Sequence, residues 1–219
     1  MRRRLAILAL PLAVGCLPYT VASTARPVPA GLREQTASLY FLPNGINRQG
    51  DSAALPLRGA DFEMRNGIDA RSDWGLRFTS GNGAVLSYKR LFSDTATRRA
   101  ALAVELSGGL VNFGEHAMLG GTLLASAPER RDVTPYGGLR VLQVAPLSAG
   151  AVHDRPSIGA FVGARLGRRT YGVSPELGVF HDPSALKVRK GSLLLVPSIS
   201  VHGDELLRAI RRMGGLPRL

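Results

Sequence analysis

The sequence predicts an all-β protein, an antiparallel up-and-down meander closed as a barrel of about eight to ten strands, with a short C-terminal helix. Apolar residues recur at every second position, most clearly between Ala100 and Val111, where Leu102, Val104 and Leu106 share one face. The same alternation recurs at roughly even spacing from about Phe62 to Val201, and no helical period separates the segments. Closure into a barrel would remove the exposed strand edges.

The N-terminus predicts export. Residues 1–4 are basic, and residues 5–14 form an apolar run that is too short to span a bilayer, so residues 1–15 are expected to be a signal peptide. The stretch Ala13-Val14-Gly15-Cys16 resembles the lipobox of bacterial lipoproteins. The resemblance implies cleavage before Cys16, diacylglycerol on its thiol and, with Leu17 following, location in the outer membrane. The alternative is ordinary signal cleavage near residues 22–25, which would discard Cys16.

Residues 16–57 are interpreted as a tether with one possible first strand. Residues 25–32 contain two prolines and little charge, which is typical of a linker. Residues 36–42 are long enough for a short strand, and residues 43–52 are rich in turn-forming residues.

The barrel itself is expected over residues 58–203. A hairpin turn is predicted at 80–83, where the sequence reads Ser-Gly-Asn-Gly. The predicted strands lie at residues 62–70, 74–79, 84–92, 100–111, 119–126, 136–145, 158–166, 170–179 and 193–201.

The face opposite the aliphatic one is composed of Gly, Ala, Ser and Thr with a few charges of both signs. A solvated face is usually rich in Lys and Glu, whereas small residues with paired charges suit a narrow lumen. The sequence therefore predicts apolar faces in contact with lipid and the charges inside the barrel. The candidate lumen charges are Glu63, Arg65, Asp69, Arg77, Glu105, Arg165 and Glu176.

Two stretches resemble small, uncharacterised bacterial outer-membrane barrels. The first runs from Phe62 to Asp69 and on through Trp74 to Phe78, and the second is Tyr171 to Phe180. The resemblance implies a β-barrel in the outer membrane. Residues 204–219 are expected to form a basic amphipathic tail, in which Asp204 caps a short helix. That helix would lie on anionic lipid or cap the mouth of the barrel.

No sequence pattern predicts catalysis, a metal site or a cofactor. The four histidines are scattered, and a single cysteine cannot form an internal disulfide. The net charge of +12 is not arranged with aromatic residues as a nucleic-acid platform. The predicted function is that of a non-enzymatic cell-envelope protein whose partner is membrane lipid, with a structural or surface-binding role. The alternatives are a soluble, lipid-tethered barrel that binds an apolar ligand, and a barrel-borne lipid hydrolase that uses Ser200 and His202, as lipid A deacylases use such residues.

Overall fold

The computed structural model describes residues 18–46, 55–80, 83–93, 99–147, 155–168, 170–183 and 192–203. Ten strands form one closed sheet within these ranges. They are β1 (Arg33–Ile46), β2 (Leu55–Gly67), β3 (Ser72–Thr79), β4 (Gly83–Leu91), β5 (Ala101–Val111), β6 (His116–Ser126), β7 (Val133–Pro146), β8 (Ser157–Arg168), β9 (Tyr171–His181) and β10 (Leu193–Gly203).

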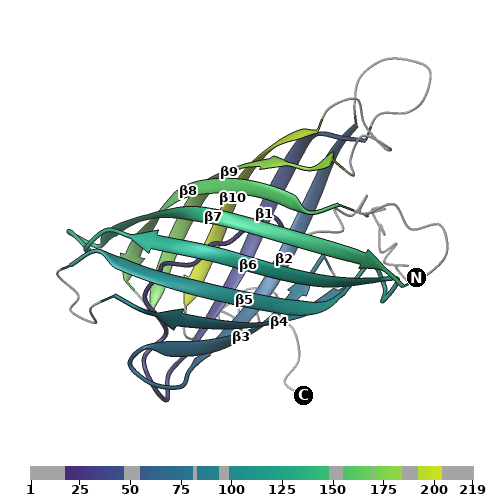
Figure 1. Ribbon diagram of the computed structural model, residues 1–219. Helices are drawn as coiled ribbons and strands as arrows, with labels where there is room; N and C mark the ends of the chain where they lie inside the picture. The colour runs from purple at the N-terminus through teal and green to yellow at the C-terminus, as the bar shows by residue number, and fades with distance from the viewer. Residues whose placement is uncertain are drawn as a thin grey trace, which may run out of the picture.

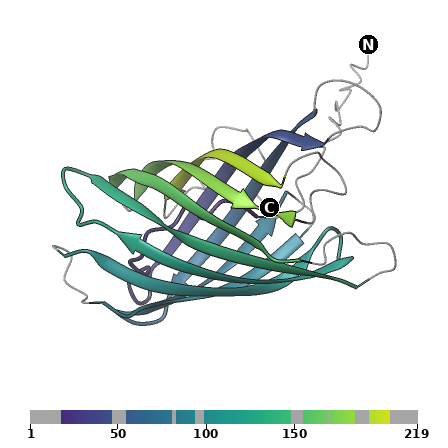
Figure 2. The same cartoon turned by 45° about the horizontal axis from the view of Figure 1, so that its top comes forward.

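Each strand pairs antiparallel with its sequence neighbours, and β1 also pairs with β10, which closes the barrel (Figures 1 and 2). The predicted meander and its closure are confirmed. The predicted helix in residues 204–219 lies outside the described residues, as do the predicted signal peptide and Cys16. Nowhere in the described part of the chain is there a helix of the length and apolarity that crossing a membrane requires.

The two ends of the barrel differ in their connections. At the proximal end, where β1 begins and β10 ends, the connections after β2, β4, β6 and β8 contain four, nine, six and two residues. At the distal end, the connections after β1, β3, β5, β7 and β9 contain eight, three, four, ten and eleven residues. The two longest connections are therefore at the distal end.

The first hairpin extends further than the sequence predicted. The expected short strand at 36–42 is the middle of the fourteen-residue β1, and β2 begins at Leu55, so the barrel includes residues assigned to the tether. The alternation of β1 is weak because its inward positions include Thr36 and Ser38, while its outward positions include Ala37. Apolar spacing alone could therefore not mark the full strand.

Apolar side chains cover the outside of the barrel, and charged side chains lie inside it. On β5, Leu106 is 59% exposed, whereas the neighbouring Glu105 is 4% exposed. All strands except β2 carry exposed large apolar side chains among their described residues. Examples along the sheet are Leu39, Phe78, Leu86, Leu106, Leu119, Leu139, Val162, Leu177 and Leu195.

The chain before β1 lies inside the barrel. Residues 18–28, the luminal segment, are buried or half-buried and are surrounded by the strands. The segment runs from the distal end, where Tyr19 packs on Phe180, to the proximal end, and a turn at Gly31 (φ 74°) then leads into β1. Residues 25–32, which the sequence suggested as a tether, are thus the proximal part of this segment and the turn that follows it.

Candidate functional site

Arg65 on β2 is the centre of a buried ion-pair network in the lumen. Its guanidinium donates to Glu63 Oε1 at 2.7 Å, to Glu105 Oε2 at 2.8 Å and to Asp73 Oδ1 at 2.5 Å. These carboxylates come from β2, β5 and β3, so one cation joins three strands. A buried cation with several charge-assisted hydrogen bonds is much less costly than an unpaired one.

The register of the sheet extends this network. Glu63 pairs with Arg77 across β2 and β3, and Arg77 Nη2 donates to Glu63 Oε2 at 2.6 Å. Lys89 pairs with Glu105 in the β4–β5 register, and its Nζ lies 3.4 Å from Asp73 Oδ2. Because alternate residues point inward, charges at odd positions of β2, β3, β4 and β5 meet inside the barrel.

A glycine makes room for the network. A Cβ atom at Gly75 would lie 2.8 Å from Glu63 Oε1, 2.8 Å from Ser87 Oγ and 3.2 Å from Arg65 Cγ. The space that a side chain would fill at this inward position is occupied by the ion pairs. The absence of a side chain at Gly75 therefore leaves room for the side chains of Arg65 and Glu63.

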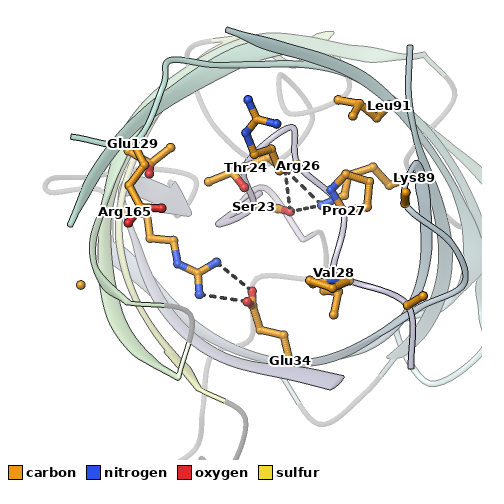
Figure 3. Close-up of a pocket in the computed structure, with 15 residues that line it drawn as sticks. Ser23, Thr24, Arg26, Pro27, Val28, Glu34, Lys89, Leu91, Glu129 and Arg165 are labelled. Carbon is orange, nitrogen blue, oxygen red and sulfur yellow. Dashed lines mark hydrogen bonds and ion pairs between the residues drawn. The ribbon is translucent and has the colours of Figure 1, made fainter. Parts of the chain in front are cut away.

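The predicted lumen charges fall into three places. Glu63, Arg65, Arg77 and Glu105 form the network described above. Near the proximal mouth, the guanidinium of Arg165 donates to both carboxylate oxygens of Glu34, at 3.1 and 2.9 Å (Figure 3). Glu176 is buried and contacts the luminal segment.

Asp69 is not a lumen charge. It lies exposed in the connection after β2, because the strand ends at Gly67. Its Oδ1 accepts a hydrogen bond from the backbone N–H of Arg71 at 2.7 Å, and this bond holds the pKa of Asp69 below its usual value. The predicted strand at residues 62–70 therefore extends three residues beyond the end of β2.

Several inward charges were missed by the sequence reasoning, namely Glu34, Asp61, Asp73, Lys89 and Arg140. Each lies an even number of residues from the other inward positions of its strand. Starting the predicted strands two residues earlier would have included most of them. With these included, the strands place six carboxylates and five cations inside the barrel, a formal sum of −1 (5 − 6). The lumen is therefore close to neutral, although the whole chain has a net charge of +12.

Glu176 holds the middle of the luminal segment. Its Oε1 accepts from the backbone N–H of Val21 at 2.9 Å, and its Oε2 accepts from that of Ala22 at 2.8 Å. The hydroxyl of Tyr136 donates to the same Oε2 at 3.0 Å. One carboxylate thus satisfies two successive main-chain donors.

Two arginines, Arg77 on β3 and Arg140 on β7, also contact the segment. Arg77 Nη1 donates to the carbonyl oxygen of Thr20 at 2.5 Å, and Arg140 Nη1 donates to the same oxygen at 2.7 Å. Arg77 Nη2 also donates to the carbonyl oxygen of Val21 at 3.1 Å. The hydroxyl of Thr20 donates to Asp61 Oδ2 at 3.3 Å. Both the donors and the acceptors of this stretch are therefore satisfied by the barrel wall.

The proximal part of the segment is held in the same way. Lys89 Nζ donates to Ser23 Oγ at 2.9 Å and to the carbonyl oxygen of Thr24 at 3.1 Å. The backbone N–H of Val28 donates to Asp73 Oδ2 at 2.8 Å. Figure 3 shows Ser23, Thr24, Val28 and Lys89 inside the ring of strands. Lys89 and Asp73 thus link the ion-pair network to the segment.

Apolar side chains close the distal part of the lumen. The ring of Tyr19 lies 5.1 Å from that of Phe180, and its hydroxyl donates to Asp182 Oδ2 at 2.9 Å. The buried cluster around this pair comprises Tyr40, Leu42, Val85, Val111, Met118, Leu142, Val144, Leu194 and Val196. The sequence predicted small or polar residues inside the barrel, but both faces of the strands are apolar at this level.

A cavity of about 470 Å³ remains at the proximal mouth, beside the luminal segment. Its lining includes Lys89, Glu34, Arg165, Arg26 and Glu129 (Figure 3). The cavity therefore brings charges of both signs together around the segment.

Ser200 and His202 do not form a catalytic pair. Ser200 Oγ donates to Ser38 Oγ at 2.7 Å, whereas His202 Nε2 lies 2.7 Å from Ser174 Oγ and its Nδ1 lies 3.0 Å from Thr36 Oγ1. These side chains are almost wholly buried inside the barrel, away from its outer surface. The arrangement supports a hydrogen-bonded link between β1, β9 and β10. No group of three or more His, Cys, Asp or Glu side chains in the described ranges is placed to hold a metal ion.

No protein-family model matches the chain, and no curated protein matches it in sequence. Two solved barrels are similar in structure. The outer-membrane protein OprG from Pseudomonas aeruginosa is 9% identical, with a TM-score of 0.37 and coverage of 82% of this chain and 99% of that chain. Ail, the attachment invasion locus protein of Yersinia pestis, was solved with the heparin analogue sucrose octasulfate. It is 12% identical, with a TM-score of 0.28 and coverage of 78% and 96%.

Proposed function

We propose that this chain is an integral β-barrel of the bacterial outer membrane with a non-enzymatic structural or surface-binding role. The observation that carries the proposal is the inverted distribution of side chains. Leu102, Val104 and Leu106 point outward, while Glu105 and the carboxylates around Arg65 are buried. Such a surface is stable in hydrocarbon and would be insoluble in water.

Charges and aromatic rings on the outer surface support a membrane boundary. The outward-facing charges of the described strands are Arg33, Arg58, Arg90 and Arg168, which lie at or near strand ends. Trp74, Tyr88 and Tyr171 are exposed and lie near the proximal end. Membrane barrels place such rings at the lipid–water interface.

The alternative of a soluble barrel that carries an apolar ligand is less well supported. Its ligand would need an apolar interior, whereas the middle of this lumen contains ion pairs and is occupied by the chain itself. The lipid-hydrolase alternative is also less well supported, because Ser200 is buried and bonded to Ser38.

We assign the proximal end to the periplasm and the distal end to the cell exterior. Barrels of this class have short periplasmic turns and longer extracellular loops, and the connections of ten and eleven residues are distal. The distal loops are therefore the proposed surface-binding region. Biotinylation of intact cells should label a cysteine placed in the connection after β9 and not one placed after β6.

Lipidation of Cys16 remains part of the proposal. Labelled palmitate should be incorporated by the wild type and lost in Cys16→Ser. Carbonate extraction of that variant tests integration separately, because a barrel that spans the membrane stays in the pellet without its lipid. Release of Cys16→Ser into the supernatant would refute the integral barrel, and retention with a heat-dependent gel shift would support it.

A further inference from the structure

The barrel wall recognises the main chain of the luminal segment more than its side chains. Seven hydrogen bonds join charged groups of the wall to backbone atoms between residues 20 and 28. Fewer bonds join the barrel to the described side chains of the segment, at Tyr19, Thr20, Ser23 and Arg26. Contacts of the first kind fix the path of a chain without requiring a particular sequence.

The groups that make these contacts belong to the rigid sheet. Arg77 and Asp73 lie on β3, Lys89 on β4, Arg140 on β7 and Glu176 on β9. Their side chains reach the segment from several sides and from different heights in the barrel. A peptide with the backbone conformation of this segment would thus find both donors and acceptors along the wall.

We propose that the lumen is a binding site for a peptide that follows the backbone path of the luminal segment, including its left-handed residue at Ala22 (φ 51°), and that the luminal segment is a separable plug that occupies this site and closes the barrel. The site is main-chain-directed, with Glu176 taking two successive N–H groups and Arg77 with Arg140 taking the carbonyl group before them. This proposal goes beyond the proposed location in the outer membrane. Peptide binding to the barrel can be measured in detergent, so its test does not depend on which membrane holds the protein.

The composition of the segment permits its withdrawal. Between Thr20 and Ala25 no side chain is larger than Val or Thr, so this stretch is narrow, and Tyr19 is the bulkiest side chain that withdrawal toward the proximal end would draw through the lumen. The attachment to β1 is accessible, since residues 29–33 are exposed and the chain turns at Gly31. The plug is therefore joined to the barrel by a surface turn.

The segment fills space that the strands leave open. Barrels of about eight strands are filled by their own side chains, and larger ones enclose more room. Here the ten-stranded barrel buries residues 18–25 in that room, and Tyr19 closes its distal part against Phe180. Without the plug, the middle of the lumen would be lined by the charges of the ion-pair network and its distal part by the apolar cluster around Phe180.

The test uses the full chain with a recognition site for a sequence-specific protease inserted between Gly31 and Leu32. The protein is folded first, then cleaved, so folding does not depend on removing the plug. A fluorescent synthetic peptide of residues 18–31 is then added to the cleaved barrel in detergent, and its binding is followed by anisotropy. The matched control peptide is N-methylated at Val21 and Ala22, which removes both donors to Glu176.

We expect the peptide to exchange into the cleaved barrel and not into the uncut one. The N-methylated peptide should bind at least about tenfold more weakly, because each lost bond was made to a charged acceptor. Absence of exchange into the cleaved barrel would show that the segment is a permanent part of the core and would overturn the proposal. Equal binding of both peptides would overturn main-chain recognition.

Whether the luminal segment blocks the barrel is tested by conductance measurements in planar bilayers. The cleaved barrel, washed free of its segment, should give stepwise conductance that the added peptide blocks, whereas the uncut barrel should be silent. A washed barrel that keeps its heat-dependent gel shift but does not conduct would overturn the role of the segment as a plug. The N-methylated peptide serves again as the control and should block only at higher concentration.

Discussion

Replacement of Arg65 by Met tests whether the ion-pair network holds four strands together. Methionine has a similar length and fills space flexibly, but it leaves the charges of three carboxylates behind. Glu63 keeps its contact with Arg77 at 2.6 Å, and Asp73 keeps Lys89 at 3.4 Å. Glu105 loses its salt bridge at 2.8 Å and stays buried.

The expected cost follows from that one orphaned carboxylate. Removing one partner of a buried ion pair costs about 3–5 kcal/mol, so Arg65→Met should lower the free energy of unfolding by about that amount. Adding Glu105→Gln to Arg65→Met removes the uncompensated charge and should recover much of the loss, with a coupling free energy of about 1–3 kcal/mol. Arg90→Met, at an exposed position, is the control and should stay within about 0.5 kcal/mol.

Urea unfolding in detergent micelles measures these values, with two readouts. The fluorescence of Trp74, the single tryptophan, reports the outer surface of β3, and the heat-dependent gel shift reports barrel closure. A fully folded Arg65→Met barrel within about 1 kcal/mol of wild type would refute the reasoning. If Glu105→Gln restores no stability to Arg65→Met, the loss of stability in Arg65→Met does not come from the unpaired charge of Glu105.

Two further substitutions test the outer surface and the packing of the lumen. Leu106→Arg, in the middle of β5, should cost about 2–4 kcal/mol in lipid vesicles, whereas Leu102→Arg, near the strand end, should cost about 0–1 kcal/mol; equal costs in the two variants would contradict a lipid-facing belt. Gly75→Ala should destabilise the barrel because its Cβ would lie 2.8 Å from Glu63 Oε1, while Gly121→Ala, with no atom within 4 Å, should be neutral in the same urea assay. If the two alanine variants unfold at the same urea concentration, the ion pairs do not need the space at Gly75.

The fold could be predicted from the sequence because alternation is a local property. Residues such as Leu102, Val104 and Leu106 show the face of a strand without knowledge of its partners, and even spacing with short connections then predicts a meander. β1 was underestimated for the same reason. Its Thr36 and Ser38 point inward, where a polar residue is expected, but the small outward Ala37 gives little contrast.

The candidate site was predictable in kind and not in detail. The alternation of side chains along each strand places Glu63, Arg65, Arg77 and Glu105 on the inward face. Which of these charges meet depends on the register between strands, which the alternation does not give. The luminal segment had no signal that could separate it from a linker. Its small residues and prolines are compatible with a linker and with a segment inside a barrel. Most of its bonds to the wall are made by backbone atoms, which every sequence has in common.

The contact between β1 and β10 decides when the barrel acquires its contents. It has six residue pairs, fewer than the eleven that join β9 to β10, and it is the seam at which the first and last strands meet. Before the seam closes, residues 18–28 can enter from the side. Afterwards, a covalently attached segment could reach the same position only by threading lengthwise. Pairing of β1 with β10 therefore encloses a segment that is already in place, and any later exchange of the segment has to run lengthwise through an end of the closed barrel.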